Sequence, residues 1–84
     1  MSKKEKLLQK VLFSTNDKNI KFDDIVTLLK SLEFELTIKG SHHIFSKKGV
    51  PYKPNIQKDG NMLKSFQVKQ IRNMIFEFKL WENI

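Results

Sequence analysis

The sequence predicts an α+β fold in which a three-stranded antiparallel sheet carries helices on one of its faces. Apolar residues recur at helical spacing near both ends of the chain, and between residues 34 and 46 they alternate with polar residues. Glycine-containing turns separate the alternating segments. The predicted order is therefore helix, helix, three strands, helix. A chain of 84 residues has room for one small domain, which we assign to residues 1–84.

Two helices are predicted before the sheet. The first covers about residues 3–13, because residues 2–5 have the pattern of a capping box and the polar run 14–19 ends the helix. Its apolar face comprises Leu7, Leu8, Val11 and Leu12. The second helix has Asp23 and Asp24 in its first turn, where the helix dipole favours acids. Its apolar face comprises Ile25, Leu28, Leu29 and Leu32, which are predicted core residues.

Strands are predicted at 34–39 and 41–46, joined through Gly40, where the chain turns or forms a bulge. The half-buried face of the first strand comprises Phe34, Leu36 and Ile38. Residues 55–57 are predicted to add a short edge strand, because two prolines interrupt the segment before them. Ser65 is the predicted N-cap of the last helix. The apolar stripe of that helix comprises Val68, Ile71, Ile75 and Phe78.

The net charge of +7 is unevenly distributed along the chain. Residues 1–33 contain seven lysines and five acids, whereas residues 36–76 contain eight cations and one acid, Asp59. The eight cations are Lys39, Lys47, Lys48, Lys53, Lys58, Lys64, Lys69 and Arg72. A basic half of this kind is typical of a protein that binds a polyanion, so nucleic acid is the predicted partner. The alternative is a lysine-rich surface that serves solubility.

Two adjacent histidines, His42 and His43, follow the pair Gly40-Ser41. Histidine is the side chain best suited to exchange protons near neutral pH. Neighbouring residues of a strand point to opposite faces, so the two rings cannot easily flank one phosphate. If Ile44 faces the core, His42 shares that face, and a bulge at Gly40 would reverse this orientation. The alternative is that both histidines are half-buried polar residues.

The composition excludes several classes of site. There is no cysteine, which excludes disulfides, thiolate metal ligands and cysteine nucleophiles. Two histidines on opposite faces, with Asp59 as the one nearby acid, give no ligand cluster, so we expect no metal and no cofactor. No apolar stretch approaches ~18 residues, and the N-terminus lacks the apolar core of a signal peptide. We therefore expect a cytoplasmic protein without a membrane partner.

Several segments resemble HicA toxins, the ribonuclease halves of HicA–HicB toxin–antitoxin pairs. They are residues 22–32, Phe34, the run Gly40-Ser41-His42-His43-Ile44-Phe45, residues 55–57 and residues 66–72, all within about residues 20–76. The resemblance implies a double-stranded-RNA-binding-domain-like fold, metal-independent cleavage of mRNA and an antitoxin partner resembling HicB. It assigns the catalytic role to His42, whereas His43 falls at a variable position. The helix at about 3–13 lies outside the usual family core.

The chemistry that the resemblance implies uses the RNA as its own nucleophile. A base removes the 2′-hydroxyl proton, the oxygen attacks the adjacent phosphorus, and an acid protonates the leaving 5′-oxygen. Weaker candidates for RNA contact are Lys39, Gly40, Ser41, Lys47, Lys48 and Lys53. Glu33 departs from the family, where glycine usually stands, and a left-handed glutamate there costs about 1 kcal/mol. The alternatives are a non-catalytic RNA-binding module of the same fold, which reads A-form shape, and a protein-interaction domain.

Overall fold

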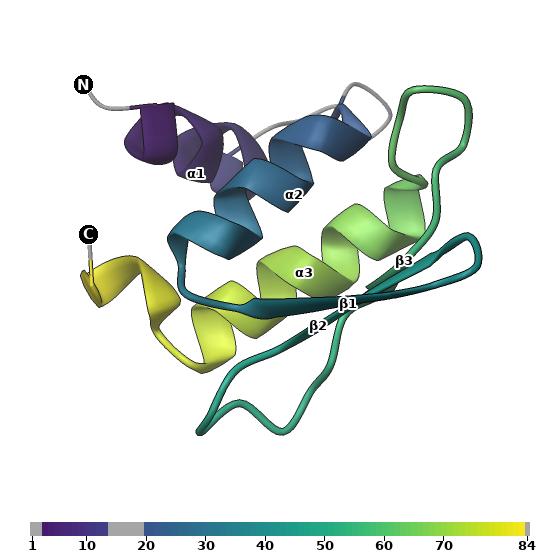
Figure 1. The fold of residues 1–84 in the computed structure, drawn as a ribbon. Helices are drawn as coiled ribbons and strands as arrows, with labels where there is room; N and C mark the ends of the chain where they lie inside the picture. The colour runs from purple at the N-terminus through teal and green to yellow at the C-terminus, as the bar shows by residue number, and fades with distance from the viewer. Residues whose placement is uncertain (1–2, 14–19, 84) are drawn as a thin grey trace.

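The computed structural model describes residues 3–13 and 20–83. Within them, three α-helices and a three-stranded antiparallel sheet form an α+β fold (Figure 1). The elements are α1 (Lys3–Phe13), α2 (Phe22–Ser31), β1 (Glu35–Lys39), β2 (His42–Ser46), β3 (Asn55–Ile56), α3 (Ser65–Glu77) and a final 3-10 helix, η2 (Leu80–Asn83). The predicted fold class and order, with the N-terminal helix, are confirmed. None of the helices described is long and apolar enough to span a membrane.

The sheet is a meander with β2 in its centre. β1 and β2 pair over all five residues of each strand, ending with Lys39 opposite His42. Gly40 and Ser41 therefore form a two-residue hairpin turn and not a bulge. Gly40 has φ +59° and Ser41 has no positive φ, which matches a type II′ turn, because only its first central residue needs a positive φ. Glycine adopts it without a steric penalty.

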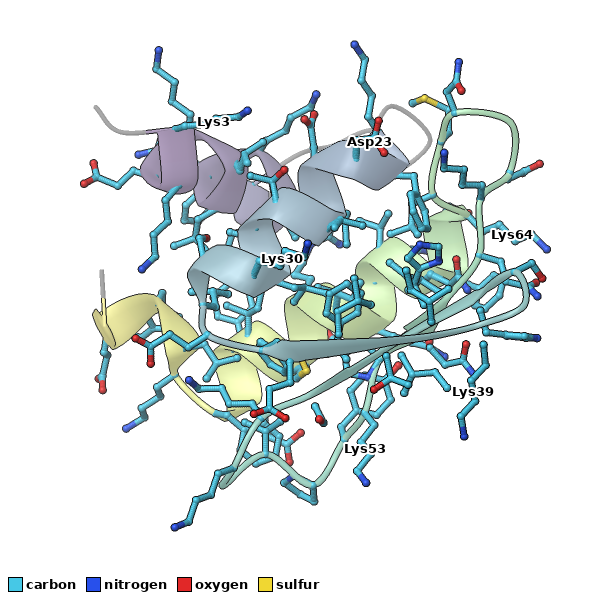
Figure 2. All side chains as sticks on the ribbon, viewed as in Figure 1. Lys3, Asp23, Lys30, Lys39, Lys53 and Lys64 are labelled. Carbon is cyan, nitrogen blue, oxygen red and sulfur yellow. The ribbon has the colours of Figure 1, made fainter. Side chains whose placement is uncertain are left out.

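The two faces of the sheet have different neighbours. Helices lie along one face (Figure 1), where Phe45 of β2 and Ile56 of β3 are buried. The other face is open to solvent, and the labelled Lys39 extends from that side (Figure 2). Ile44 does not face the core, because Phe45 takes the inward position of β2. His42 does share a face with Ile44, but this face is the open one.

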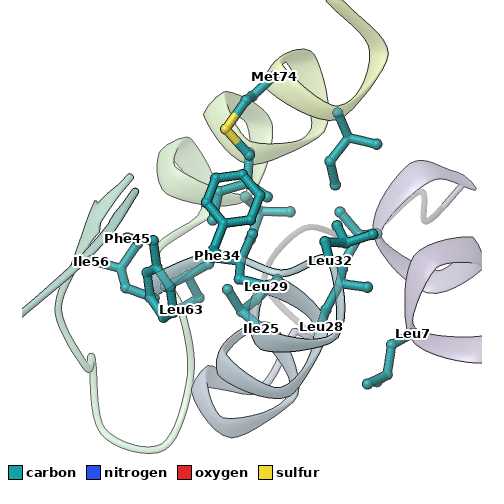
Figure 3. Packing of buried hydrophobic residues seen from close by; sticks show 14 of the residues in the cluster. Leu7, Ile25, Leu28, Leu29, Leu32, Phe34, Phe45, Ile56, Leu63 and Met74 are labelled. Atoms are coloured by element: carbon teal, nitrogen blue, oxygen red, sulfur yellow. The ribbon is translucent and has the colours of Figure 1, made fainter. Parts of the chain in front are cut away.

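The core is one cluster to which the helices and the sheet contribute. Figure 3 shows labelled side chains of α2, α3 and the sheet meeting around Phe34. The predicted core residues of α1 and α2 are confirmed, except that Leu12 is only half-buried. Ile38 was predicted on the half-buried face of the first strand but is 59% exposed. The reason is that the end of the β1–β2 hairpin reaches beyond the helices (Figure 1).

The end of α2 is held by a left-handed residue. Glu33 has φ +70°, as its position after the helix predicts. The amide of Glu33 donates to the carbonyl of Lys30, and the amide of Phe34 donates to the carbonyl of Leu29, both at 3.0 Å. This pair of hydrogen bonds defines a Schellman motif, and the buried Phe34 and Leu29 supply its usual apolar contact.

α1 is attached to the other helices by apolar and polar contacts. Its buried residues are Leu7, Leu8 and Val11. Arg72 of α3 donates from Nε to the carbonyl of Val11 at 2.8 Å, which satisfies one of the last carbonyls of α1. Lys10 and Asp24 form an ion pair between α1 and α2 at 3.9 Å. An exposed pair at this distance adds little stability, so the apolar contacts and Arg72 hold α1 in place.

Some element boundaries differ from the prediction. The N-cap of α3 is Lys64, not Ser65, and its side chain makes no capping hydrogen bond. β2 begins at His42, one residue later than predicted, because the preceding serine belongs to the turn. The predicted capping box includes a residue outside the described ranges, and the whole polar run 14–19 also lies outside them.

Candidate active site

The open face of the sheet arranges side chains in rows that cross the strands. Lys39 of β1 lies opposite His42 of β2. The register of β2 with β3, continued by one residue, places Gln57 opposite His42. Asn55 lies two residues from Gln57 on the same face and is therefore diagonal to His42. His42 thus stands between a lysine on one side and two amides on the other, beside the turn at Gly40.

The imidazole of His42 is exposed but held by its neighbours. Its Nδ1 lies 3.0 Å from Oδ1 of Asn55. Because an amide oxygen can only accept, a hydrogen bond here requires the hydrogen to be on Nδ1. In the neutral ring the lone pair is then on Nε2. Nε2 is therefore the atom of His42 that can accept a proton.

The side chain of Gln57 covers the ring of His42. Its Nε2 lies 3.1 Å from Nε2 and 3.4 Å from Nδ1 of the histidine. An atom so near to both ring nitrogens lies over the face of the ring, because an in-plane partner of one nitrogen is much farther from the other. The same amide nitrogen donates to Oγ of Ser41 at 3.2 Å. Gln57 therefore connects β3, the hairpin turn and the histidine.

His43 lies on the opposite face of the sheet from His42, as predicted. Its ring packs edge-on against Phe22 of α2, with the centroids 4.9 Å apart and the planes at 82°. Nζ of Lys58 lies 5.5 Å from the centroid of the same phenylalanine. Within the described part of the chain, Nδ1 of His43 is buried without a hydrogen-bond partner. These contacts place His43 in the packing between the sheet and α2.

The lysines predicted to contact RNA are divided between the two faces. Lys39 and Lys53 extend from the side of the sheet away from the helices (Figure 2). Lys48 is exposed in the turn after β2. Lys47 points toward α2, where its Nζ donates to the carbonyl of Leu32 at 2.9 Å. Lys47 therefore caps α2 and does not share the open face with His42.

Most cations of the basic half remain uncompensated. Arg72 contacts α1, and Lys47 contacts the end of α2. Six exposed lysines have no carboxylate of the described residues within ion-pair distance: Lys39, Lys48, Lys53, Lys58, Lys64 and Lys69. The predicted positive surface is therefore present, although two of its members have structural partners.

The described residues contain no metal-ligand cluster. Within residues 3–13 and 20–83, no three His, Asp or Glu side chains form a group that could hold a metal ion. Asp59, the one acid of the basic half, pairs with Met62 across a turn at Gly60, where φ is +64°. The neighbours of the His42 ring are instead the neutral amides of Asn55 and Gln57.

Asn55 and Gln57 are site residues that the sequence prediction missed. Both were assigned to an edge strand, but neither was identified as a partner of His42. The available signal was the alternation of polar and apolar residues, which places both amides on the face opposite the buried Ile56. Gln67 was missed as well. It is 8% exposed and donates from Nε2 to the carbonyl of Asn55 at 3.3 Å, which ties β3 to α3.

Protein-family models, curated proteins and solved structures were compared with this chain, and none of them matches it. The resemblance to HicA toxins therefore rests on the residues of the chain. The geometry around His42 is the basis on which a function can be proposed.

Proposed function

We propose that this chain is a cytoplasmic toxin of the HicA type, an endoribonuclease that cleaves mRNA without a metal. One observation carries the proposal: His42 is exposed, its Nδ1 lies 3.0 Å from Oδ1 of Asn55, and Lys39 lies opposite it in the same row. This arrangement places a proton acceptor beside a cation on a surface that a long polymer can reach. It therefore suits a phosphodiester substrate.

We also infer a double-stranded-RNA-binding-domain-like fold for the segment from α2 to α3. The order α2, β1, β2, β3, α3 supports it, as does the placement of both helices along one face of the sheet (Figure 1). Domains of this kind recognise RNA largely by shape and phosphate contacts. α1 and η2 are additions at the two ends of this unit.

The proposed reaction begins at the 2′-hydroxyl next to the scissile phosphate. Nε2 of neutral His42 accepts the hydroxyl proton while the oxygen attacks phosphorus. The bond to the 5′-oxygen then breaks, and the imidazolium returns the proton to that oxygen. The products are a 2′,3′-cyclic phosphate and a free 5′-hydroxyl. Acid–base help of this kind contributes about 10²–10⁴-fold, and Lys39 and Lys53 stabilise the added negative charge.

The decisive test is incubation of the purified protein with a long RNA in EDTA. Cleavage should proceed, leave a 2′,3′-cyclic phosphate or its opened form, and fail where deoxyribose replaces ribose at the scissile position. His42→Ala should abolish cleavage with the fold intact, because the side chain is exposed. His43→Ala is the matched control and should lower stability more than cleavage, because its ring packs on Phe22. Cleavage of DNA, a strict need for magnesium, or full activity of His42→Ala would refute the mechanism.

The same experiment separates the proposal from a non-catalytic RNA-binding module. Such a module would bind RNA with a strong salt dependence, because the exposed lysines displace counterions. It would not cut the RNA under any of these conditions. If the wild-type protein binds RNA but never cleaves it, the result supports the RNA-binding module and refutes the endonuclease proposal.

We propose an acidic antitoxin resembling HicB as the protein partner. A chain with net charge +7 associates fastest with a partner of opposite charge. The partner is expected to cover His42 and the neighbouring lysines and so to block RNA. Co-expression with the adjacent open reading frame should rescue growth and yield a stable complex. A complex that still cleaves RNA at the undiminished rate would contradict the proposed inhibition by the partner.

A further inference from the structure

We infer that Asn55 and Gln57 are positioning residues, which determine the nitrogen of His42 that exchanges the proton and the direction in which the ring faces. The catalytic consequence rests on the proposed function. The tautomer and orientation of His42 do not, so they can be tested on the protein alone.

The tautomer follows from the contact with Asn55. Free neutral histidine in water favours the form with hydrogen on Nε2. Oδ1 of Asn55, 3.0 Å from Nδ1 of His42, selects the opposite form because it can only accept a hydrogen bond. The lone pair is thereby moved to Nε2. Asn55 thus performs the orienting task that a carboxylate or carbonyl performs for many catalytic histidines, without adding a negative charge that would repel RNA.

The orientation of the ring follows from the contact with Gln57. An exposed histidine on a strand has several accessible rotamers. The amide of Gln57 lies over the ring and is itself fixed by its hydrogen bond to Oγ of Ser41. The ring is therefore bounded in its plane by Asn55 and across its face by Gln57. A fixed ring is what a near-attack arrangement of base and hydroxyl requires.

The amides can perform this task because β3 is itself held in place. The buried Gln67 of α3 donates to the carbonyl of Asn55 at 3.3 Å. On the other side, β3 pairs with β2, where Ile44 lies opposite Asn55 and His43 lies opposite Ile56. The position of Asn55 relative to His42 is thus determined by a strand whose backbone is bonded on both sides.

Nitrogen NMR of the imidazole rings tests the tautomer directly, since the sequence contains only two histidines. The neutral ring of His42 should carry its hydrogen on Nδ1. In Asn55→Ala the hydrogen should move mainly to Nε2, whereas Glu35→Gln should change nothing, because Glu35 lies at the far end of the same face. A wild-type ring with hydrogen on Nε2 would overturn the inference, whether or not the protein cleaves RNA.

Asn55→Asp supplies a second test with a predicted outcome. Carboxylate oxygens, like the amide oxygen, can only accept, so the neutral ring of His42 should keep its hydrogen on Nδ1 in this variant. Lys39, the charged group that faces His42 from β1, is unchanged in this variant. A neutral ring with its hydrogen on Nε2 in Asn55→Asp would overturn the inference.

Cleavage assays then measure the catalytic consequence. Asn55→Ala and Gln57→Ala should each lower kcat by about 10- to 100-fold with a smaller change in KM, as expected when a base is misplaced. Asn55→Gln retains an acceptor and is the variant in which part of the rate should return. Wild-type rates in both alanine variants would overturn the catalytic part. A wild type that never cleaves, but shows the expected tautomer, would instead refute the proposed function and support the positioning of the ring.

Discussion

Replacing Glu33 by glycine should stabilise the protein. Glu33 has φ +70° at the position that follows α2. A residue with a Cβ atom loses about 1–2 kcal/mol in this left-handed conformation, whereas glycine adopts it without a steric penalty. The hydrogen bonds of the Schellman motif are made by the backbone, so they are retained in the variant.

Two smaller terms oppose the gain. The greater freedom of glycine in the unfolded chain removes about 0.4–1 kcal/mol. The variant also lacks the ion pair between Lys47 Nζ and Glu33, at 3.8 Å, but the glutamate side chain is 87% exposed. Such a pair contributes about 0–1 kcal/mol, and Lys47 keeps its hydrogen bond to Leu32. Because so exposed a pair contributes close to zero, the net expectation is a stabilisation of about 0.5–1 kcal/mol, or a rise in Tm of about 2–8 °C.

Thermal and urea unfolding measure this effect, and two variants separate its causes. Glu33→Ala removes the ion pair while keeping the Cβ atom, so it should leave Tm almost unchanged or lower it slightly. Lys79→Gly tests a second left-handed residue, with φ +51° after α3, and should stabilise as well. If Glu33→Gly is no more stable than Glu33→Ala, the left-handed backbone at residue 33 does not lower the stability of the protein, and the reasoning is refuted.

Two further predictions concern charge and pH. Lys39→Gln and Lys53→Gln should each lower the log–log slope of RNA affinity against salt by about 0.7 for every phosphate that the variant no longer neutralises. Lys3→Gln in α1 is the control and should leave the slope unchanged. Equal effects of all three variants would contradict an RNA site on the open face of the sheet. Burial raises the pKa of the Tyr52 hydroxyl above its usual 10.0. Because the folded state has the higher pKa, this contribution to stability is complete below about pH 10 and is lost as the pH rises through the folded pKa. Tyr52→Phe should remove that loss from unfolding curves measured at alkaline pH, and an unchanged alkaline decline would contradict the assignment.

The fold could be predicted from the sequence because its signals are local. The apolar spacing of α2 and α3 is the spacing of residues that a helix brings to one face, so each face could be read without knowledge of the partner. Gly40 and the alternation around it indicated a hairpin for the same reason. The left-handed conformation of Glu33 was expected from the resemblance, because the family usually has glycine at this position after the helix.

The candidate site could be predicted only in part, because its contacts depend on strand register. His42 was identified from the run that contains it, but its partners Asn55 and Gln57 lie 13 and 15 residues away. Their pairing is determined by the register of β3 against β2, which depends on the connection through residues 47–54, and a shift of one residue would reverse their faces. The count of charges likewise could not show that Lys47 bonds to the carbonyl of Leu32 at the end of α2. That contact depends on the position of the Lys47 ammonium group in the folded chain.

The edge formed by β3 has a consequence for behaviour at high concentration. The strand has only two residues, so the edge that it presents is short. The carbonyl of Asn55 is occupied by Gln67. So short an edge, with one of its carbonyls already occupied, offers little to a strand of another molecule, and we expect edge-to-edge pairing to be disfavoured there. The contacts that support the histidine on one face thus also protect the chain from templated assembly at this edge.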